Sequence, residues 1–270
     1  MSFSAHIVKD MEITKEKWKE RYASWPSDSY DIENVPKEVI ISSSYAKRFL
    51  FPNSKEKAQG IFLEAGCGTA RTSLHLSRTE NLTVLCADIS IQALLEARQF
   101  FDKYSPNAKV HFICCDLRNL PFRDKTINYI FSDGAIEHFK DTLRAAEEFN
   151  RILGSQGKVL ATVPYLSFSM LTYGQLQGNI PNAFILRNLY EWFHMILLKG
   201  RLMANGYELS FWQRDIKRIF KSTGFKDISS GHFETFNEIR FVKNRILKSW
   251  LRKLSSKQLF WPLIYISATK

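Results

Sequence analysis

The chain has 270 residues, 45% of them hydrophobic and 24% charged, which is the balance of an ordinary globular protein of one or two domains. This composition excludes a disordered chain, a coiled coil and a collagen-like repeat. The longest apolar run, about seven residues at 260–266, is far shorter than the roughly 20 needed to cross a bilayer. Residues 1–10 lack the apolar centre of a secretory signal, so we expect a cytoplasmic protein.

The formal net charge of +11 raises the question of an anionic partner. Residues 61–163 carry 12 basic and 12 acidic side chains, whereas residues 164–270 carry 16 and 6. The basic excess therefore belongs to the last third of the chain. We expect the middle third to perform its chemistry without a net charge.

The cysteines give no sign of a metal site. Cys86, Cys114 and Cys115 fall in apolar runs typical of strands, and Cys67 lies in a glycine turn. No pair of cysteines has the spacing of a zinc site, so we predict no bound metal. Reduced, buried thiols are the expectation, which fits a reducing compartment.

The middle of the chain alternates short apolar runs with segments of helical periodicity. Two helices, at 14–23 and 36–50, are predicted before it. The alternating part comprises strand 61–65, helix 69–78, strand 82–87, helix 91–103 with Ser90 as its N-cap, strand 109–115, strand 127–131, helix 140–153 ending at Gly154, and strand 158–163. This order predicts a parallel sheet with helices on both faces.

The alternation is interrupted after residue 163. Residues 165–211 hold a strongly apolar helix at 183–198, which we interpret as part of an inserted lid. A helix at 211–223 ending at Gly224, a strand at 225–233, a basic helix at 238–254 and a strand at 263–269 follow. The predicted organisation is a helical cap (1–60), a binding core (61–163), a helical lid insertion (164–210) and a segment that completes the core (211–270).

The most informative motif is the turn after the first predicted strand, Glu64-Ala65-Gly66-Cys67-Gly68-Thr69. Its glycines allow the backbone to approach a ligand closely. A dinucleotide fingerprint needs a third glycine where this chain has Arg71, so that type of site is excluded. The carboxylate of Glu64 suits an ammonium group better than a pyrophosphate.

Acidic residues also end the next predicted strands. Asp88 follows the second strand, in place to accept hydrogen bonds from ribose hydroxyls, and Asp116 follows the third, in place for an exocyclic amine. Ser132 and Asp133 follow the fourth. Ligands of open α/β sheets bind at the carboxyl ends of the strands, so these residues are expected to share one site.

With these motifs in family order, the chain resembles the class I S-adenosylmethionine-dependent methyltransferases, in the small-molecule group related to ubiquinone/menaquinone methyltransferases. The matching segments are Leu63-Glu64-Ala65-Gly66-Cys67-Gly68-Thr69, Ala87-Asp88-Ile89-Ser90, Cys115-Asp116-Leu117, Leu120-Pro121-Phe122, Glu137-His138, Arg151-Ile152-Leu153, Gly157-Lys158-Val159 and Thr223-Gly224-Phe225. The resemblance implies a doubly wound, seven-stranded Rossmann-like α/β sheet, mostly parallel with an antiparallel last strand.

The resemblance also implies a cofactor, S-adenosyl-L-methionine, with S-adenosyl-L-homocysteine as its product. The implied roles place Glu64, Gly66, Cys67 and Gly68 beside the methionine part, Asp88 on the ribose hydroxyls, Ile89 against adenine, Asp116 and Leu117 at the adenine edge, and Ser132 near the sulfonium. Two positions depart from the family pattern: Ala70 replaces the third glycine of the turn, and Ile127-Asn128 replaces Phe-Asp at the start of strand four.

Two neighbouring residues are candidates for the general base. His138 follows strand four and has a side chain that titrates near working pH, and Glu137 is the second candidate. The alternative for His138 is a helix-start histidine bonded to the backbone. Tyr22 and Trp25 are candidates to fold over the cofactor, with surface or core packing as the alternative.

The acceptor is predicted to be a small molecule, bulky or apolar, because the lid is rich in large apolar side chains: Phe168, Met170, Tyr173, Phe184, Tyr190, Trp192, Phe193 and Met195. Packing of the lid onto the sheet is the alternative use of these residues. Two other functions stay open, an RNA methyltransferase and a non-catalytic cofactor-binding partner. The segment after strand four lacks the Asn/Asp-Pro-Pro-aromatic motif of nucleic-acid amino methyltransferases, which argues against the first.

The end of the chain forms a basic, amphipathic pattern. Residues 239–270 contain no acidic residue, and Ile239, Val242, Ile246, Trp250 and Leu254 recur at helical spacing between basic side chains. The apolar face either packs on the sheet or docks on an anionic membrane through Ile239–Lys257, and an acidic protein partner is a third alternative. Burial of Trp250 would indicate packing, and exposure would indicate docking.

Overall fold

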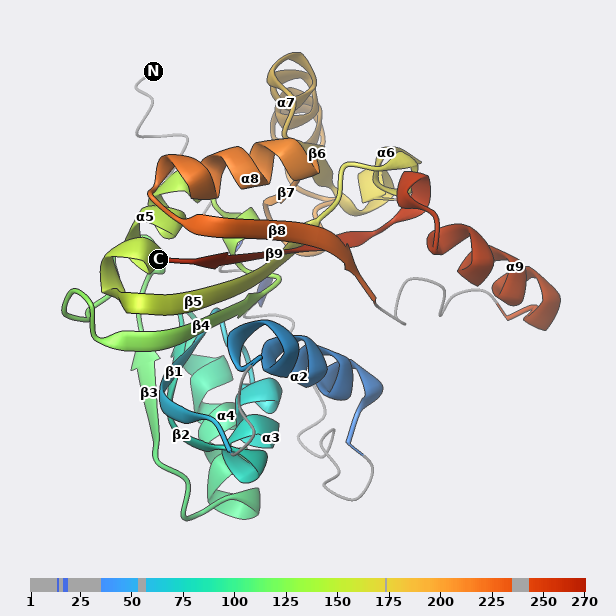
Figure 1. Cartoon of the computed structure of the whole chain (residues 1–270). Coiled ribbons are helices and arrows are strands. Elements are labelled where there is room, and N and C mark those ends of the chain that lie inside the picture. The colour runs from blue at the N-terminus through green and yellow to red at the C-terminus, as the bar shows by residue number, and fades with distance from the viewer. Residues whose placement is uncertain (1–13, 15–16, 19–34, 53–56, 173, 235–242) are drawn as a thin grey trace.

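The computed structural model describes residues 14, 17–18, 35–52, 57–172, 174–234 and 243–270. Its centre is a seven-stranded sheet (Figure 1) in the order β3-β2-β1-β4-β5-β9-β8. The strands are β1 (Gln59–Ala65), β2 (Asn81–Asp88), β3 (Val110–Cys114), β4 (Ile127–Asp133), β5 (Leu153–Pro164), β8 (Lys226–Phe233) and β9 (Leu263–Thr269). β9 runs antiparallel to both of its neighbours, and the other pairs are parallel. The predicted doubly wound sheet is confirmed.

Helices cover both faces of this sheet because successive strand residues point to opposite sides. One face packs against α2 (Lys37–Leu50), α3 (Arg71–Thr79) and α4 (Ile91–Tyr104) through residues such as Phe62 and Phe131. The other face packs against α5 (Thr142–Ile152) and α8 (Gln213–Ser222) through residues such as Leu63 and Ile130. The two apolar clusters leave the carboxyl ends of the parallel strands as the place for polar chemistry.

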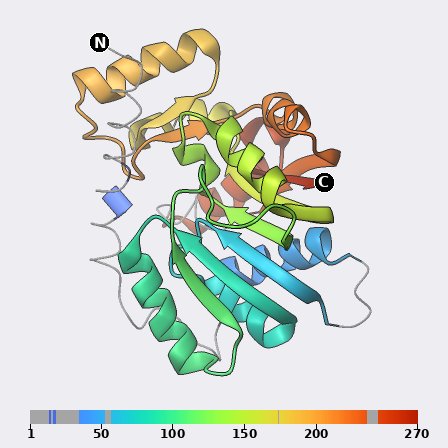
Figure 2. The same cartoon turned by 90° about the vertical axis from the view of Figure 1, so that its left-hand side faces the viewer.

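Residues 164–210, the predicted lid insertion and called the lid below, contain helices and also a small sheet that the sequence did not indicate. The lid elements are α6 (Phe168–Thr172), η2 (Gly174–Gln177), β6 (Asn179–Pro181), α7 (Phe184–Glu191), the π-helical η3 (Trp192–Leu197) and β7 (Glu208–Ser210). β6 and β7 pair in parallel, apart from the main sheet. Figure 2 shows α7 set apart from the main sheet, at the top left of that view.

Capping residues correct several predicted helix ends. α5 begins at Thr142 rather than Lys140, because the Asp141 carboxylate accepts a hydrogen bond from the Arg144 N–H (3.3 Å). The predicted Gly154 cap of this helix is wrong: Leu153 is already extended and starts β5 directly. Ser90 does cap α4, as predicted, by accepting from the Ala93 N–H (3.3 Å).

The basic helix is shorter than predicted and does not pack on the sheet. α9 spans Arg245–Ser255, and the Asn244 side chain caps it by accepting from the N–H groups of Ile246 and Leu247, both at 3.0 Å. Ile239 and Val242 lie outside the described residues. Because Trp250 is 58% exposed, the packing alternative is wrong for the described part of this helix.

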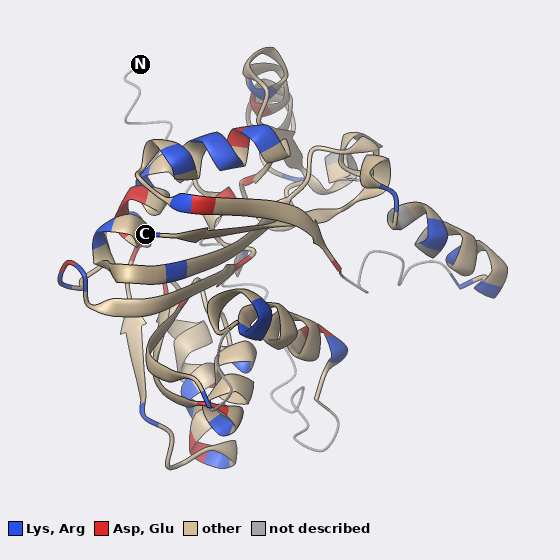
Figure 3. Ribbon diagram, viewed as in Figure 1, with Lys and Arg blue, Asp and Glu red and all other residues tan. Residues whose placement is uncertain are grey.

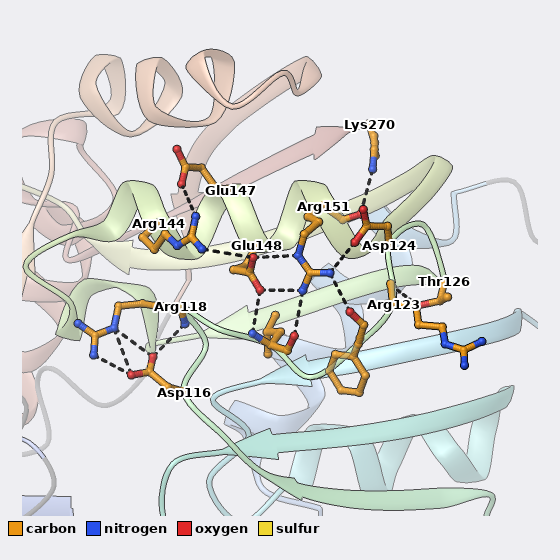
Figure 4. Close-up of polar contacts among 12 residues, drawn as sticks. Asp116, Arg118, Arg123, Asp124, Thr126, Arg144, Glu147, Glu148, Arg151 and Lys270 are labelled. Atoms are coloured by element: carbon orange, nitrogen blue, oxygen red, sulfur yellow. Dashed lines mark hydrogen bonds and ion pairs between the residues drawn. The ribbon is translucent and has the colours of Figure 1, made fainter.

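An arginine cluster fixes the loop between β3 and β4, which carries Asp116 (Figure 4). Arg151 of α5 donates to the backbone carbonyls of Leu120 (2.9 Å) and Phe122 (2.8 Å) and pairs with Glu148 and Asp124. Glu148 in turn accepts from the Leu120 N–H (2.8 Å). The loop is thereby held against α5, which sets the position of the residues after β3.

None of the helices in the described ranges combines the length and apolar character needed to cross a bilayer.

Candidate active site

The turn after β1 has the conformation that its glycines predict. Gly66 and Gly68 have φ angles of +76° and +51°, and Ala70 has +50° just before α3. A Cβ on Gly66 would lie 2.2 Å from the Cβ of Ala135, in the loop after β4. Only glycine therefore fits at position 66, because the ends of β1 and β4 approach each other there.

Asp88 fastens this turn to the end of β2. Its carboxylate accepts hydrogen bonds from the N–H groups of Gly68 and Ser90, both at 2.8 Å. The N–H groups of Gly66 and Cys67 donate to the Ala87 carbonyl (2.8 and 3.0 Å). Burial raises the pKa of Asp88, although the hydrogen bonds from the N–H groups of Ser90 and Gly68 oppose the rise. The structure therefore brings Gly66, Cys67, Gly68 and Asp88 together, as the sequence predicted.

Glu64 lies beneath the same turn, 5% exposed at the end of β1. It accepts a hydrogen bond from the Ser73 N–H in the first turn of α3 (3.0 Å). Burial raises its pKa to about 8, and the nearby carboxylates of Asp133 and Asp88 add to the rise. A cation bound beside Glu64 would reverse this shift by favouring the ionised form.

The residues after β3 lie at the edge of this site. Asp116 forms a two-pronged ion pair with Arg118, 2.7 Å at its shortest, which Figure 4 shows. Leu117 is buried, and its side chain comes within 3.7 Å of the position that a Gly66 Cβ would take. Ile89 packs on the same apolar cluster. Leu117 is thus beside the turn, while the Asp116 carboxylate already has an arginine partner.

The two polar residues at the end of β4 differ in what they contact. The fully buried Ser132 hydroxyl donates to the Ala65 carbonyl (2.9 Å), so in this structure it joins β4 to β1. Asp133 accepts from the hydroxyls of Ser42 in α2 (2.8 Å) and Thr162 in β5 (2.5 Å). Burial raises the pKa of Asp133. The sequence placed Asp133 at this end of the sheet, but the family resemblance assigned it no contact with the cofactor.

His138 is oriented by a backbone carbonyl. Its Nδ1 lies 2.7 Å from the Tyr207 oxygen, and because a carbonyl only accepts, Nδ1 carries the proton of that bond. In the neutral ring this leaves Nε2 as an unprotonated nitrogen. Trp18 packs edge-on against the ring, with centroids 5.6 Å apart. Backbone bonding and base chemistry are both compatible with this geometry, because they use different nitrogens of the ring.

Glu137, the second candidate base, is enclosed and is 2% exposed. Its Oε2 has no hydrogen-bond partner among the described residues. Burial raises its pKa well above the usual range, and the neighbouring Glu208 adds to the rise. Burial therefore favours the protonated form of Glu137, which can donate a hydrogen bond.

An ion-pair cluster that the sequence analysis missed fastens the lid beside His138. Glu191 of α7 accepts from the Tyr207 hydroxyl (2.7 Å), Arg187 (3.0 Å) and Lys140 (2.9 Å). Arg187 also donates to the Lys140 carbonyl (2.8 Å). Burial acts in the opposite direction, but these hydrogen bonds hold the pKa of Glu191 below its usual value.

Tyr22 and Trp25, the candidates to fold over the cofactor, lie outside the described residues. Across the described part of the chain, no group of three or more His, Cys, Asp or Glu side chains is arranged to hold a metal ion. The described site is thus a glycine turn surrounded by carboxylates at the ends of β1, β2, β3 and β4.

Comparison with known proteins identifies this arrangement. Residues 62–157 match the family model described as a methyltransferase domain. The chain is a class I S-adenosylmethionine-dependent methyltransferase. It is 22% identical over 240 residues to the ubiquinone/menaquinone biosynthesis C-methyltransferase of Rickettsia prowazekii, a match that covers 82% of this chain and 90% of that enzyme. It is 31% identical over 166 residues to the malonyl-[acyl-carrier protein] O-methyltransferase of Hamiltonella defensa, a match that covers 56% of this chain and 59% of that enzyme.

A solved structure shares the fold. The phosphoethanolamine N-methyltransferase 2 of Haemonchus contortus, solved with S-adenosylhomocysteine, aligns with a TM-score of 0.55 and 22% identity. The alignment covers 85% of the methyltransferase described here and 52% of the nematode chain, so this chain spans about half the length of that protein.

The cofactor is S-adenosylmethionine, and the residues of the site fit it. Its sulfonium and ammonium groups are cations, and the carboxylates of Glu64, Asp88 and Asp133, which N–H and O–H donors hold in place, can attract them. We propose that Glu64 and the Gly66–Gly68 turn hold the methionine part and that Asp88 holds the ribose hydroxyls. Asp116, which pairs with Arg118, is the proposed partner of the adenine amine.

Replacement of Asp88 by alanine is expected to weaken cofactor binding by about 1.5–3 kcal/mol, roughly 10- to 150-fold, because charge-assisted hydrogen bonds are lost. Titration calorimetry with S-adenosylmethionine measures the change. Asp102→Ala, an exposed aspartate of α4, is the control and should bind normally. Unchanged affinity in a folded Asp88→Ala protein would remove Asp88 from the site.

Glu64 predicts a pH effect whose sign follows from its raised pKa. In the free protein Glu64 keeps its proton up to about pH 8, whereas the unfolded chain loses it near 4.5, so its contribution to stability falls as pH rises between these values. Binding of the cationic cofactor at pH 7 should then release most of a proton. Calorimetry in buffers of different ionisation enthalpy measures this release, which Glu64→Gln should abolish. An equal release by Glu64→Gln would assign the proton to another group.

Proposed function

We propose that this methyltransferase acts on a small molecule with a bulky, apolar body. The observation that carries the proposal is the lid, whose α7–η3 helix leaves large apolar side chains uncovered beside the site. Phe184 is 88% exposed, Ile185 78% and Trp192 51%. A surface of this kind is typical of a site that closes on an apolar ligand.

Packing of the lid onto the sheet accounts for only part of its apolar side chains. Met195 belongs to the core, and Tyr190 packs against it. Most other large apolar side chains of α7 and η3 face solvent: Phe184, Ile185, Leu186, Leu189, Trp192, Phe193, Ile196 and Leu197. Packing therefore does not explain why this segment is so apolar.

The lid is fastened next to the candidate base. Lys140, two residues after His138, is bonded to both Arg187 and Glu191 of α7. Tyr207 links the same cluster to His138, because its hydroxyl donates to Glu191 while its carbonyl accepts from His138. An acceptor bound under α7 would thus lie beside the imidazole.

Unpartnered polar groups support a polar end on the acceptor. Glu137, Asn179 and Ser210 are buried, and the described residues leave Glu137 Oε2, both Asn179 side-chain polar atoms and the Ser210 hydroxyl without hydrogen-bond partners. Glu137 belongs to η1 (Ile136–His138), which packs against β7, and β7 pairs with β6. Buried polar groups need partners, and an acceptor's polar end would supply them.

The bound cofactor supplies a methyl group made electrophilic by the sulfonium. The chain's own residues position the acceptor and receive its proton. Where the acceptor atom must lose a proton as its new bond to carbon forms, His138 Nε2 accepts that proton while Nδ1 keeps its bond to Tyr207. Glu137 in its protonated form donates a hydrogen bond to the acceptor. Positioning of the acceptor supplies most of the rate.

The named relatives support this substrate class. The Rickettsia prowazekii enzyme is named for ubiquinone and menaquinone biosynthesis, whose quinones are bulky and apolar. An RNA acceptor is the second candidate function because the chain is basic. It is disfavoured because carboxylates surround the site, whereas the basic excess belongs to residues 164–270. We place the enzyme in the cytoplasm, with peripheral attachment to a membrane.

Substitution of His138 by asparagine separates orientation from base chemistry. The amide N–H of asparagine can take over the bond to the Tyr207 carbonyl, but nothing replaces Nε2. We expect kcat to fall by about 10²- to 10⁴-fold with cofactor affinity unchanged. Glu137→Gln, which keeps a neutral donor, should lose less than about tenfold. Equal losses in both variants, measured by S-adenosylhomocysteine formation, would contradict the assignment of His138 as the base.

An acceptor panel tests the substrate class. Phenols and quinols with alkyl chains of increasing length are offered beside phosphoethanolamine and RNA, and S-adenosylhomocysteine formation is measured. We expect kcat/KM to rise about threefold to fourfold for each buried methylene. Turnover only with RNA, or only with phosphoethanolamine, would overturn the proposal, and turnover with any acceptor excludes a non-catalytic role.

The lid supplies the matched variants for this panel. Phe184→Ser with Trp192→Ser should lower kcat/KM for long-chain acceptors at least about tenfold and leave cofactor affinity within about twofold. Ile40→Ser with Leu95→Ser changes two exposed apolar residues on α2 and α4 and should behave as the original enzyme.

A further inference from the structure

The helix α9 stands away from the rest of the enzyme with its apolar side uncovered. Figure 1 shows it extending from the end of the sheet on the right of the view. Ile246 is 83% exposed, Trp250 58% and Leu247 46%. In a single helix outside the core, three large exposed apolar side chains indicate a binding surface.

These side chains share one face of the helix. At about 3.6 residues per turn, Ile246, Leu247 and Trp250 point to one side, together with Leu251 and Leu254, which are half-buried. Arg245 and Lys248 point to the opposite side, and Lys253 lies at the boundary. α9 is therefore amphipathic, with an apolar face and a basic face.

The basic face has no acidic residue to neutralise it nearby in the sequence. Residues 239–270 contain no aspartate or glutamate, and in Figure 3 α9 carries blue segments without red ones. Within the described ranges, no carboxylate forms an ion pair with Arg245, Lys248, Lys253 or Lys257. The charge of this face is thus available to an anionic partner.

The uncovered surface continues from α9 toward the lid. The next element, η5 (Gln258–Phe260), places the Phe260 ring against Phe168 of α6, with centroids 5.8 Å apart. Leu259 and Phe168 are 64% and 53% exposed. A flat partner bound to α9 would therefore also meet α6 of the lid.

We propose that α9 docks the enzyme on an anionic lipid bilayer, with Ile246, Leu247 and Trp250 in the interface and the basic side chains against lipid phosphates. An isolated helix with a tryptophan on its apolar face and basic residues on the other is typical of interfacial binding. RNA would use the basic face and leave the apolar one uncovered. Only the benefit of docking rests on the proposed apolar acceptor: docking would hold the lid at the bilayer in which such an acceptor dissolves.

Sedimentation of the full chain with vesicles tests the proposal without any acceptor. Vesicles of phosphatidylcholine with about 30% phosphatidylglycerol are compared with vesicles of pure phosphatidylcholine at low and high salt. We expect binding to the anionic vesicles that weakens at high salt. Arg245→Glu with Lys248→Glu should lower the partition coefficient about thirtyfold or more, since each basic residue near the surface contributes about 1 kcal/mol.

Two further variants distinguish the surface and its partner. Ile246→Ser with Trp250→Ser keeps every charge and should also lose binding at least about tenfold. Lys221→Glu with Lys226→Glu makes the same charge change at exposed positions of α8 and β8 and should bind as the original protein. Absence of binding to anionic vesicles, undiminished binding of either α9 variant, or a dimer that the serine variant dissociates would overturn the proposal. Turnover of a detergent-dissolved acceptor tests the proposed function separately. An enzyme that does not bind vesicles but still methylates such an acceptor would contradict docking and leave the proposed function intact.

Discussion

The active site of this methyltransferase is organised by carboxylates that are taken out of water without a cation to balance them. Glu64, Asp88 and Asp133 are each held by N–H or O–H donors at the carboxyl ends of β1, β2 and β4. Burial raises the pKa of all three. A cationic ligand bound beside them favours their ionised forms, and the glycine turn, α2 and α3 are each attached to one of these groups.

The lid is held by a different balance. On its inner side, Glu191 is saturated by Tyr207, Arg187 and Lys140, which fixes α7 next to η1 through hydrogen bonds rather than apolar packing. Most of the other large apolar side chains of α7 and η3 are uncovered. The attachment and the apolar surface are therefore supplied by different side chains, so the surface can adapt to a ligand while the attachment persists.

Features that depend on residues close together in the sequence were predictable, whereas features that depend on contacts between distant segments were not. Strand β9 was predicted at its observed bounds because its own apolar pattern defines it. The three-residue strands β6 and β7 are too short for periodicity and exist only because they meet each other. Likewise the glycine turn and Asp88 were recognised from local motifs, whereas Asp133 depends on Ser42 and Thr162, 91 and 29 residues away. The predicted helix starts were wrong where a single capping side chain, Asp141 or Asn244, determines the first residue of the helix.

The position of β9 has a consequence for how the sheet assembles. β9 lies between β5 and β8, so two strands that precede it in the chain both pair with it. Until β9 is in place, β5 has an open edge and β8 has no neighbour in the main sheet. These unpaired edges therefore need protection from pairing with other chains until β9 closes the sheet.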